Sequence, residues 1–216
     1  MPGVFLFFFK NVENVQEDSL KEGNVRNLKS IVSQPRFLQA ITAAAFAYAV
    51  MSFLMTATPL SMHVMENMSL KETGLVLQFH VVAMFLPSLI TGNLIKKYGH
   101  SAIIYGGVLF FFITVLISLF EQTYLNYMLS LIFLGLGWNF LFISGTSLVV
   151  LTYNKEEKFK VQGINDLIVF STMALASLSA GILLNSIGWK MMNIICIPFL
   201  ILIILVSFVA DKKSAS

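Results

Sequence analysis

The sequence predicts an all-α membrane protein in which six transmembrane helices form two inverted triplets. Three observations support this fold class: six long apolar runs, an uneven distribution of basic residues between them, and an internal repeat that relates the second run to the fifth. Together they indicate a chain that is embedded in lipid over most of its length.

The six apolar runs follow from the composition. Of 216 residues, 57% are hydrophobic and only 12% are charged, and the mean hydropathy is +0.82. A helix that crosses a bilayer core of about 30 Å needs roughly 20 predominantly apolar residues. Charged residues leave six runs of this kind intact, at 37–62, 74–95, 102–120, 124–153, 163–184 and 191–210.

Basic residues indicate how these spans are oriented. If the spans alternate in direction, twelve of the 14 Lys and Arg residues fall on one side, and only Lys71 and Lys190 fall on the other. Because cytoplasmic segments are enriched in basic residues, we expect both termini to be cytoplasmic. The same bias explains the net charge of +3, so nucleic acid is not predicted as a partner.

The two ends of the chain differ from the spans. Residues 1–36 begin with the apolar stretch MPGVFLFFF, which as a helix of about 13 Å is too short to cross the bilayer. We interpret this segment as the remnant of a preceding helix followed by a cytoplasmic linker, and residues 211–216 as a cytoplasmic tail. The single cysteine, Cys196, allows no internal disulfide, and no metal or cofactor site is predicted.

The internal repeat appears when the sequence is shifted by 89 residues. The aligned identities are Gly74 with Gly163, Met84 with Met173, Ser88 with Ser177, Leu89 with Leu178, Gly92 with Gly181, Leu94 with Leu183, and Gly99 with Gly188. Repeats of three plus three helices place such spans in opposite directions across the membrane, as the basic residues also require. Polar residues are concentrated in the first, second, fourth and fifth spans, which predicts that these four line a cavity and that the third and sixth are peripheral.

The connection after the second span, GNLIKKYGH, resembles the signature loop of the major facilitator superfamily, G-x-L-x-D-[RK]-x-G-[RK]. Gly92, Leu94, Lys97 and Gly99 match, whereas Lys96 replaces the acidic residue and His100 replaces the usual final Lys or Arg. The resemblance implies that the glycines permit a tight cytoplasmic turn and that the basic residue contacts the facing half of the transporter during gating.

Other segments are similar to the second half of bacterial permeases of this family: TATPLSM, QFHVVAMFLPSLITG, GLGWNFLFISG and VQGINDLIVF. The resemblance covers about residues 27–210 and implies the carboxy-terminal six-helix half of such a permease. It further implies transport of a small organic solute by alternating access and a location in a cell membrane, the bacterial inner membrane. The expected partners are the lipid bilayer and either an amino-terminal six-helix half or a second copy of this chain.

Polar and aromatic residues inside the spans are the candidates for function. The predicted substrate-cavity residues are Thr56, Thr58, Gln78, His80, Trp138 and Asn139, and the predicted coupling or gate residues are His80, Asn165 and Asp166. Ionisable residues in membranes often have functional roles. His80 is either a site for solute or a coupling proton, or a neutral histidine that joins two helices.

Alternatives remain open at the other candidates. Asp166 is either a proton, cation or gate site, or a carboxylate held by the helix dipole and interfacial water. Trp138 and Asn139 are either a stacking and hydrogen-bonding pair for an organic solute or packing residues. Pro87 is expected to kink the second span and to free a backbone carbonyl.

Two other classes of function compete with transport. A non-transporting membrane remnant or scaffold would carry the same spans. An intramembrane enzyme is less well supported, because the sequence FISG lacks the first glycine of a G-x-S-G element and no H-E-x-x-H helix is present. No catalytic residue is therefore predicted.

Overall fold

The computed structural model describes residues 26–215, so the apolar start that we interpret as a helix remnant lies outside the described residues. The elements in chain order are α2 (Leu28–Val32), α3 (Pro35–Pro59), η1 (Leu60–Met65), α4 (Leu70–Phe85), α5 (Ser88–Tyr98), α6 (His100–Ser118), α7 (Tyr124–Val150), η2 (Lys155–Glu157), α8 (Lys158–Ile195) and α9 (Ile197–Ala215). Residues 26–215 contain no strand, which confirms the all-α fold class.

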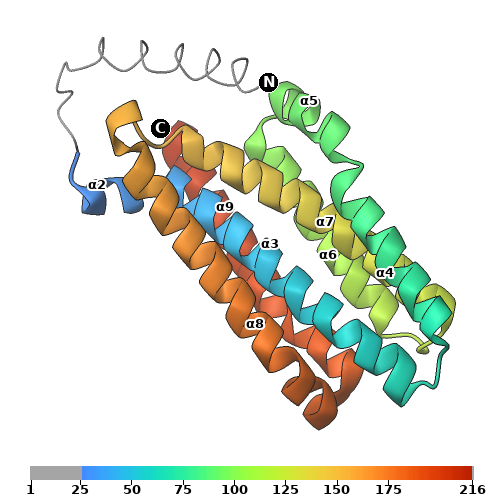
Figure 1. The fold of residues 1–216 in the computed structure, drawn as a ribbon. Coiled ribbons are helices and arrows are strands. Elements are labelled where there is room, and N and C mark those ends of the chain that lie inside the picture. The colour runs from blue at the N-terminus through green and yellow to red at the C-terminus, as the bar shows by residue number, and fades with distance from the viewer. Residues whose placement is uncertain (1–25, 216) are drawn as a thin grey trace, which may run out of the picture.

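Five helical stretches of the described chain are long and apolar enough to cross a membrane, and the last of them contains two passes. This last stretch is Lys155–Ser214. Its helix is interrupted at Gly188, where φ is 75° and ψ is 170°. At this turn the chain reverses, and α9 returns along the bundle (Figure 1). Residues 26–215 therefore make six passes.

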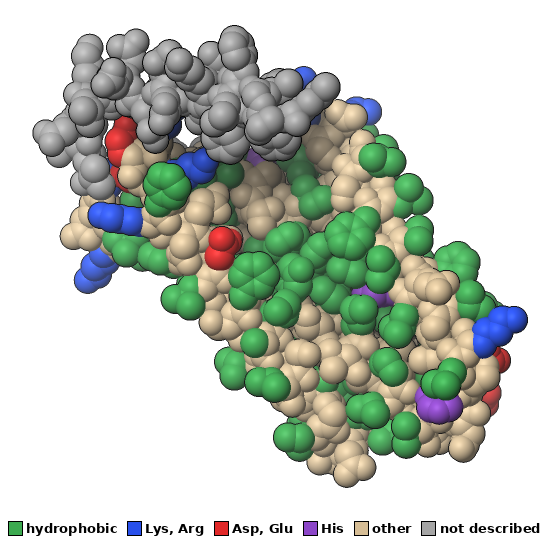
Figure 2. All heavy atoms as spheres, in the orientation of Figure 1, with side chains coloured by type: hydrophobic (Ala, Val, Ile, Leu, Met, Phe, Trp, Pro, Cys, Tyr) green, Lys and Arg blue, Asp and Glu red, His purple; other side chains and the backbone are tan. Residues whose placement is uncertain are grey.

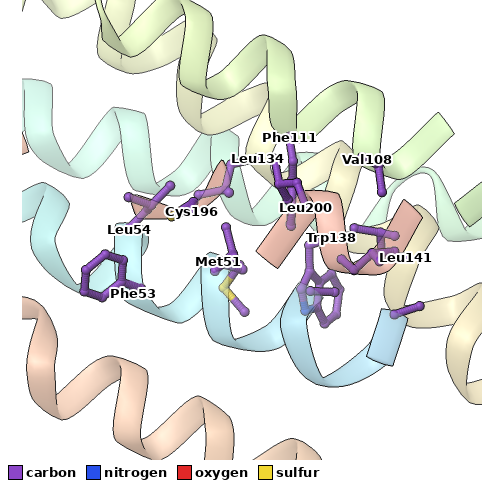
Figure 3. Packing of buried hydrophobic residues seen from close by; sticks show 14 of the residues in the cluster. Met51, Phe53, Leu54, Val108, Phe111, Leu134, Trp138, Leu141, Cys196 and Leu200 are labelled. Atoms are coloured by element: carbon purple, nitrogen blue, oxygen red, sulfur yellow. The ribbon is translucent and has the colours of Figure 1, made fainter. Parts of the chain in front are cut away.

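Helix α3 occupies the centre of the bundle and packs against α7, α8 and α9, while α7 also packs against α4 and α6. In Figure 1, α6 and α9, which correspond to the spans predicted to be peripheral, lie behind α3, α7 and α8. Figure 3 shows part of the core in which side chains of α3, α6, α7 and the last helix meet. Five alanines of α3 are completely buried, and such small side chains allow close packing of transmembrane helices: Ala40, Ala43, Ala44, Ala47 and Ala57.

Polar contacts join several helix ends at one end of the bundle. Arg36, at the start of α3, lies 2.7 Å from Oδ1 of Asp211 near the end of α9. It also donates to Ser101 at the start of α6. Arg26 forms an ion pair of 2.7 Å with Glu157 in η2. The beginning of α3 and the end of α9 therefore lie on the same side, as an even number of passes requires.

The backbone reproduces the internal repeat at equivalent positions. Gly99, between α5 and α6, has φ 84° and ψ 162°, and its counterpart Gly188 has φ 75° and ψ 170°. Glycine adopts positive φ without the steric cost that a side chain adds. The equivalent serines agree as well: Ser88 accepts a hydrogen bond from Asn139 of α7, and Ser177 bonds Thr56 of α3. Each serine thus contacts a helix of the other triplet.

A glycine of α7 sets the distance between α7 and α4. A Cβ atom added to Gly135 would lie 2.7 Å from the backbone oxygen of His80 and 3.0 Å from the backbone nitrogen of Met84. Neither backbone atom can move independently of its helix, so the two helices would have to separate. At Gly74, on α4, an added Cβ would meet no atom within 4 Å.

We therefore expect Gly135→Ala to lower the free energy of unfolding by about 1–3 kcal/mol, as overpacking does in other cores. The matched change Gly74→Ala should leave it unchanged or raise it, because alanine favours helix more than glycine does. Thermal unfolding in detergent, followed by circular dichroism, measures both. Equal melting temperatures for the two variants would contradict the close approach of α7 and α4.

Candidate functional site

Five aromatic rings from four helices meet on one face of the bundle. We call Tyr48 of α3, Phe85 of α4, Trp138 and Phe142 of α7, and Phe170 of α8 the aromatic wall. Trp138 stacks on Phe142 with ring centroids 4.9 Å apart and 14° between the planes. Tyr48 meets Trp138 edge-on at 5.3 Å and Phe142 at 5.0 Å. Phe85 extends the wall from Trp138, and Phe170 extends it from Tyr48.

The aromatic wall has a buried centre and an open rim. The side chain of Trp138 is only 4% exposed, whereas Phe85 is 59% exposed. Phe170, at the opposite edge, is 50% exposed. Figure 2 shows hydrophobic side chains gathered across the middle of this side of the bundle, with Lys and Arg toward its ends. The open rings offer surfaces on which a planar aromatic molecule can stack.

The indole nitrogen of Trp138 is an unused donor. This atom, Nε1, is buried and has no acceptor among the described residues. A donor left unpaired away from water costs about 1–3 kcal/mol. The aromatic wall therefore combines open stacking surfaces with one unpaired donor buried at its centre.

Asn139, the neighbour of Trp138, holds the break between α4 and α5. Its Nδ2 donates to the carbonyl oxygen of Met84 and to Oγ of Ser88, both at 2.7 Å. Its Oδ1 accepts from Thr91 at 2.6 Å. The kink expected at Pro87 coincides with an interruption of the helix, because α4 ends at Phe85 and α5 begins at Ser88. Asn139 thus binds a backbone carbonyl at this break.

The side chains of Trp138 and Asn139 consequently contact different neighbours. Adjacent residues of a helix point about 100° apart, so one side chain reaches the aromatic wall and the other reaches the α4–α5 break. Both amide hydrogens of Asn139 are already donated, and its side chain is completely buried. A direct contact between Asn139 and solute stays a prediction.

His80 lies between α4 and α7 and is completely buried. Its Nδ1 is 2.7 Å from the carbonyl oxygen of Leu131. Because a carbonyl oxygen only accepts, we assign the proton of the neutral ring to Nδ1, which makes Nε2 an acceptor. Nε2 is buried and has no partner in residues 26–215. Gln78 is exposed on the same helix.

The two predicted threonines are already engaged. Thr56 is exposed at the surface of α3 and bonds Oγ of Ser177 at 2.9 Å. Thr58 is buried and donates to the carbonyl oxygen of Leu54 in its own helix. Thr56 is therefore at an interhelical contact, whereas Thr58 is satisfied locally.

Asn165 and Asp166 lie near the start of α8. Asn165 is 3% exposed and donates to Oδ1 of Asp166 at 3.0 Å. The Asp166 side chain is exposed, and Oδ1 of Asn165 has no partner in the described structure. This pair presents a carboxylate at the surface of α8, one helical turn before Phe170 of the aromatic wall.

The signature loop forms the end of α5 and the turn into α6. Gly92 and Lys97 are exposed on α5, and Leu94 is half-buried. Gly99 makes the turn with its positive φ. Lys97 places its Nζ 4.9 Å from the ring centre of Tyr98.

Sequence reasoning identified Trp138 but missed the rest of the aromatic wall. The sequence contains 20 phenylalanines, most of them in apolar runs, so no pattern separates Phe85, Phe142 or Phe170 from ordinary packing residues. Only the arrangement of α3, α4, α7 and α8 brings these rings to Trp138 and Tyr48.

An all-helical membrane bundle with inverted triplets and a polar and aromatic face belongs to the class of secondary-transporter folds. The family model of the Major Facilitator Superfamily matches residues 40–216. The chain therefore belongs to this family of transporters and is a multi-pass membrane protein with the organisation of half of the family's fold. The membership predicted from the signature loop is confirmed.

Three curated relatives have transporter names. The riboflavin transporter RfnT of Brucella anthropi is 40% identical over 179 residues, covering 83% of this chain and 45% of the relative. Two uncharacterized MFS-type transporters of Bacillus subtilis also match. YdeG is 27% identical, and the match covers 88% of this chain and 44% of YdeG. YddS is 30% identical, and the match covers 68% of this chain and 34% of YddS. The chain thus spans less than half the length of these relatives.

Proposed function

We propose that the chain supplies the carboxy-terminal half of a permease that moves a small organic solute with a planar aromatic ring, of the chemical class of riboflavin, by alternating access. The aromatic wall is the observation that carries this proposal. We place the six-helix domain, residues 37–210, in the bacterial inner membrane with both termini cytoplasmic.

The chemistry of the aromatic wall supports a flat, partly polar solute. Exposed rings at Phe85 and Phe170 stack on a planar ring, and the unpaired Nε1 of Trp138 suits a carbonyl or ring nitrogen. Riboflavin combines a fused aromatic ring with such acceptors and with a hydroxylated chain. The relative that carries this solute in its name is 40% identical over 83% of the present chain.

An exposed apolar face supports the proposal that a second six-helix half packs against this chain. Beside the aromatic wall, Leu86 is 61% exposed and Leu89 is 78% exposed on the α4–α5 side. Large exposed apolar surfaces are covered by protein or lipid rather than by water. We propose an amino-terminal six-helix half as the partner, with a second copy of this chain as the alternative.

Uptake of radiolabelled riboflavin tests the proposal. Bacteria that lack their own riboflavin uptake would express the chain alone, with the amino-terminal half of its natural permease, or with that half alone. We expect saturable uptake only when both halves are present, or with the chain alone if two copies form the transporter. Absence of riboflavin transport in every combination, with both halves present in the membrane, would contradict the proposed solute.

His80, which is buried between α4 and α7, provides a second test of the proposed transport. We expect His80→Leu to reduce uptake by about tenfold, because leucine has no nitrogen that could bind the solute or a coupling proton in place of Nε2. Its unfolding free energy should fall by only about 0.6 kcal/mol, the average for an interhelical hydrogen bond in a membrane. Uptake kinetics and thermal unfolding separate the two effects.

The matched control is Ser130→Ala. Ser130 and Thr114 join α7 to α6 through hydrogen bonds away from the aromatic wall. This variant should transport normally and lose a similar amount of stability. If His80→Leu transports as well as Ser130→Ala, His80 serves packing alone.

A further inference from the structure

A concave region lies on a different side of α3 from the aromatic wall. We call it the outer groove; its volume is about 490 Å³. Helix α3 forms its floor, while α8 and the last helix flank it. Lining residues include Ala49, Phe53, Ala176, Ser179, Cys196 and Phe199.

The lining of the outer groove is almost entirely apolar, and its two hydroxyl groups donate their hydrogens within their own helix. Among its lining residues, the hydroxyl of Thr172 donates to backbone oxygens of its own helix, and so does that of Ser179. The thiol of Cys196 points to the carbonyl oxygen of Met192 at 3.4 Å. Within residues 26–215, no charged residue or histidine lines the groove. A polar solute would therefore lose its hydration without compensation.

Helix geometry places the outer groove on the opposite side of α8 from the solute face. Phe170 belongs to the aromatic wall and Ser179 to the groove. Nine residues at about 100° each separate these two side chains by about 180° around the helix. The groove therefore opens beside the peripheral helix α9, within the apolar stretch that crosses the membrane.

We infer that an acyl chain of a bilayer phospholipid occupies the outer groove. The surrounding bilayer supplies this occupant at the depth of the groove. Water finds no polar partner there, and an empty groove would forfeit dispersion contacts along its walls. A flexible hydrocarbon chain fills an irregular apolar groove without requiring hydrogen bonds. This inference does not depend on which solute is transported.

Native mass spectrometry of the full chain tests the inference. The protein is purified from vesicles of dipalmitoyl phosphatidylglycerol and dipalmitoyl phosphatidylethanolamine, and the lipid that stays bound is counted. Ala176→Phe fills the groove and should reduce the lipid-bound fraction about tenfold. Leu178→Phe, at a position that is 77% exposed and outside the groove, should leave it unchanged.

A second variant and a series of lipids keep the test valid if the first variant misfolds. The leucine of Ser179→Leu fills less of the groove than the phenylalanine of Ala176→Phe, and it should also reduce the lipid-bound fraction. With the unmodified chain, dihexanoyl lipids should be retained far less than dipalmitoyl lipids, whichever headgroup they carry. Equal retention by the unmodified chain and both groove variants would overturn the inference. So would retention that follows the headgroup rather than the chain length, or a second protein copy bound in place of lipid.

Discussion

Substitution of Trp138 by leucine is expected to weaken the binding of riboflavin by roughly tenfold or more. Stacking of a base-like ring on an open aromatic side chain such as Phe85 is worth about 1–3 kcal/mol, and Trp138, which is 4% exposed, supports these open rings from behind. Trp138 also holds the rings of Tyr48, Phe85 and Phe142 in place. Its loss removes the indole donor and loosens the stack that orients the solute.

Equilibrium binding of riboflavin to the purified two-half permease measures this effect, with uptake in cells as a second readout. Trp189→Phe is the matched control, because the other tryptophan packs on Tyr127 and does not touch the aromatic wall. Both variants should still purify as folded protein. An unchanged dissociation constant for Trp138→Leu would contradict the assignment of the aromatic wall as the solute site.

The second large effect is expected for Asn139→Leu, on stability. This change leaves the Met84 carbonyl, the Ser88 hydroxyl and the Thr91 hydroxyl without the partner that joins α7 to the α4–α5 break. Ser88 is exposed and Thr91 keeps its bond to the carbonyl oxygen of Pro87, so the Met84 carbonyl is the main buried group affected. A loss of about 1–3 kcal/mol follows, the cost of leaving a buried polar group unpaired. Unfolding by a denaturing detergent measures the loss.

Ser147→Ala is the control for Asn139→Leu. Ser147 lies on the same helix, but its hydroxyl donates only to carbonyl oxygens of that helix. We expect its stability to change by less than about 0.5 kcal/mol. Equal losses in the two variants would show that the interhelical bonds of Asn139 do not stabilise the α4–α5 break.

Sequence periodicity predicted the features that depend on lipid and on symmetry. Apolar runs predict spans because a bilayer requires every backbone group to be paired within a helix. The alignment of Gly99 with Gly188 predicted equivalent positions, and the two residues share positive φ. The kink at Pro87 was predicted for a similarly local reason, since proline cannot donate to the helix ladder.

Contacts between distant helices were not predictable in the same way. Trp138 and Asn139 are adjacent in sequence and were expected to be either a pair for an organic solute or packing residues, and Trp138 joins the aromatic wall while Asn139 binds the α4–α5 break. Tyr48 and Phe170 are far from Trp138 in sequence and join it only through the packing of α3, α7 and α8. Contacts between such distant residues depend on how each helix is rotated about its axis, and the residue types in an apolar run do not determine this rotation.

Cysteine accessibility in membranes measures directly whether the aromatic wall faces the solute pathway and the outer groove faces lipid. Cys196 is the single cysteine, so Cys196→Ser provides a background without other thiols. Phe170→Cys and Leu175→Cys would then be compared, because Phe170 is 50% exposed and Leu175 is 68% exposed on the same helix. A membrane-impermeant, water-soluble thiol reagent is applied to the assembled permease with and without riboflavin.

The expected result is modification of Phe170→Cys that riboflavin slows, and little modification of Leu175→Cys. Modification of both cysteines at the same rate, or no protection by riboflavin at Phe170→Cys, would contradict a solute pathway along α3, α4, α7 and α8.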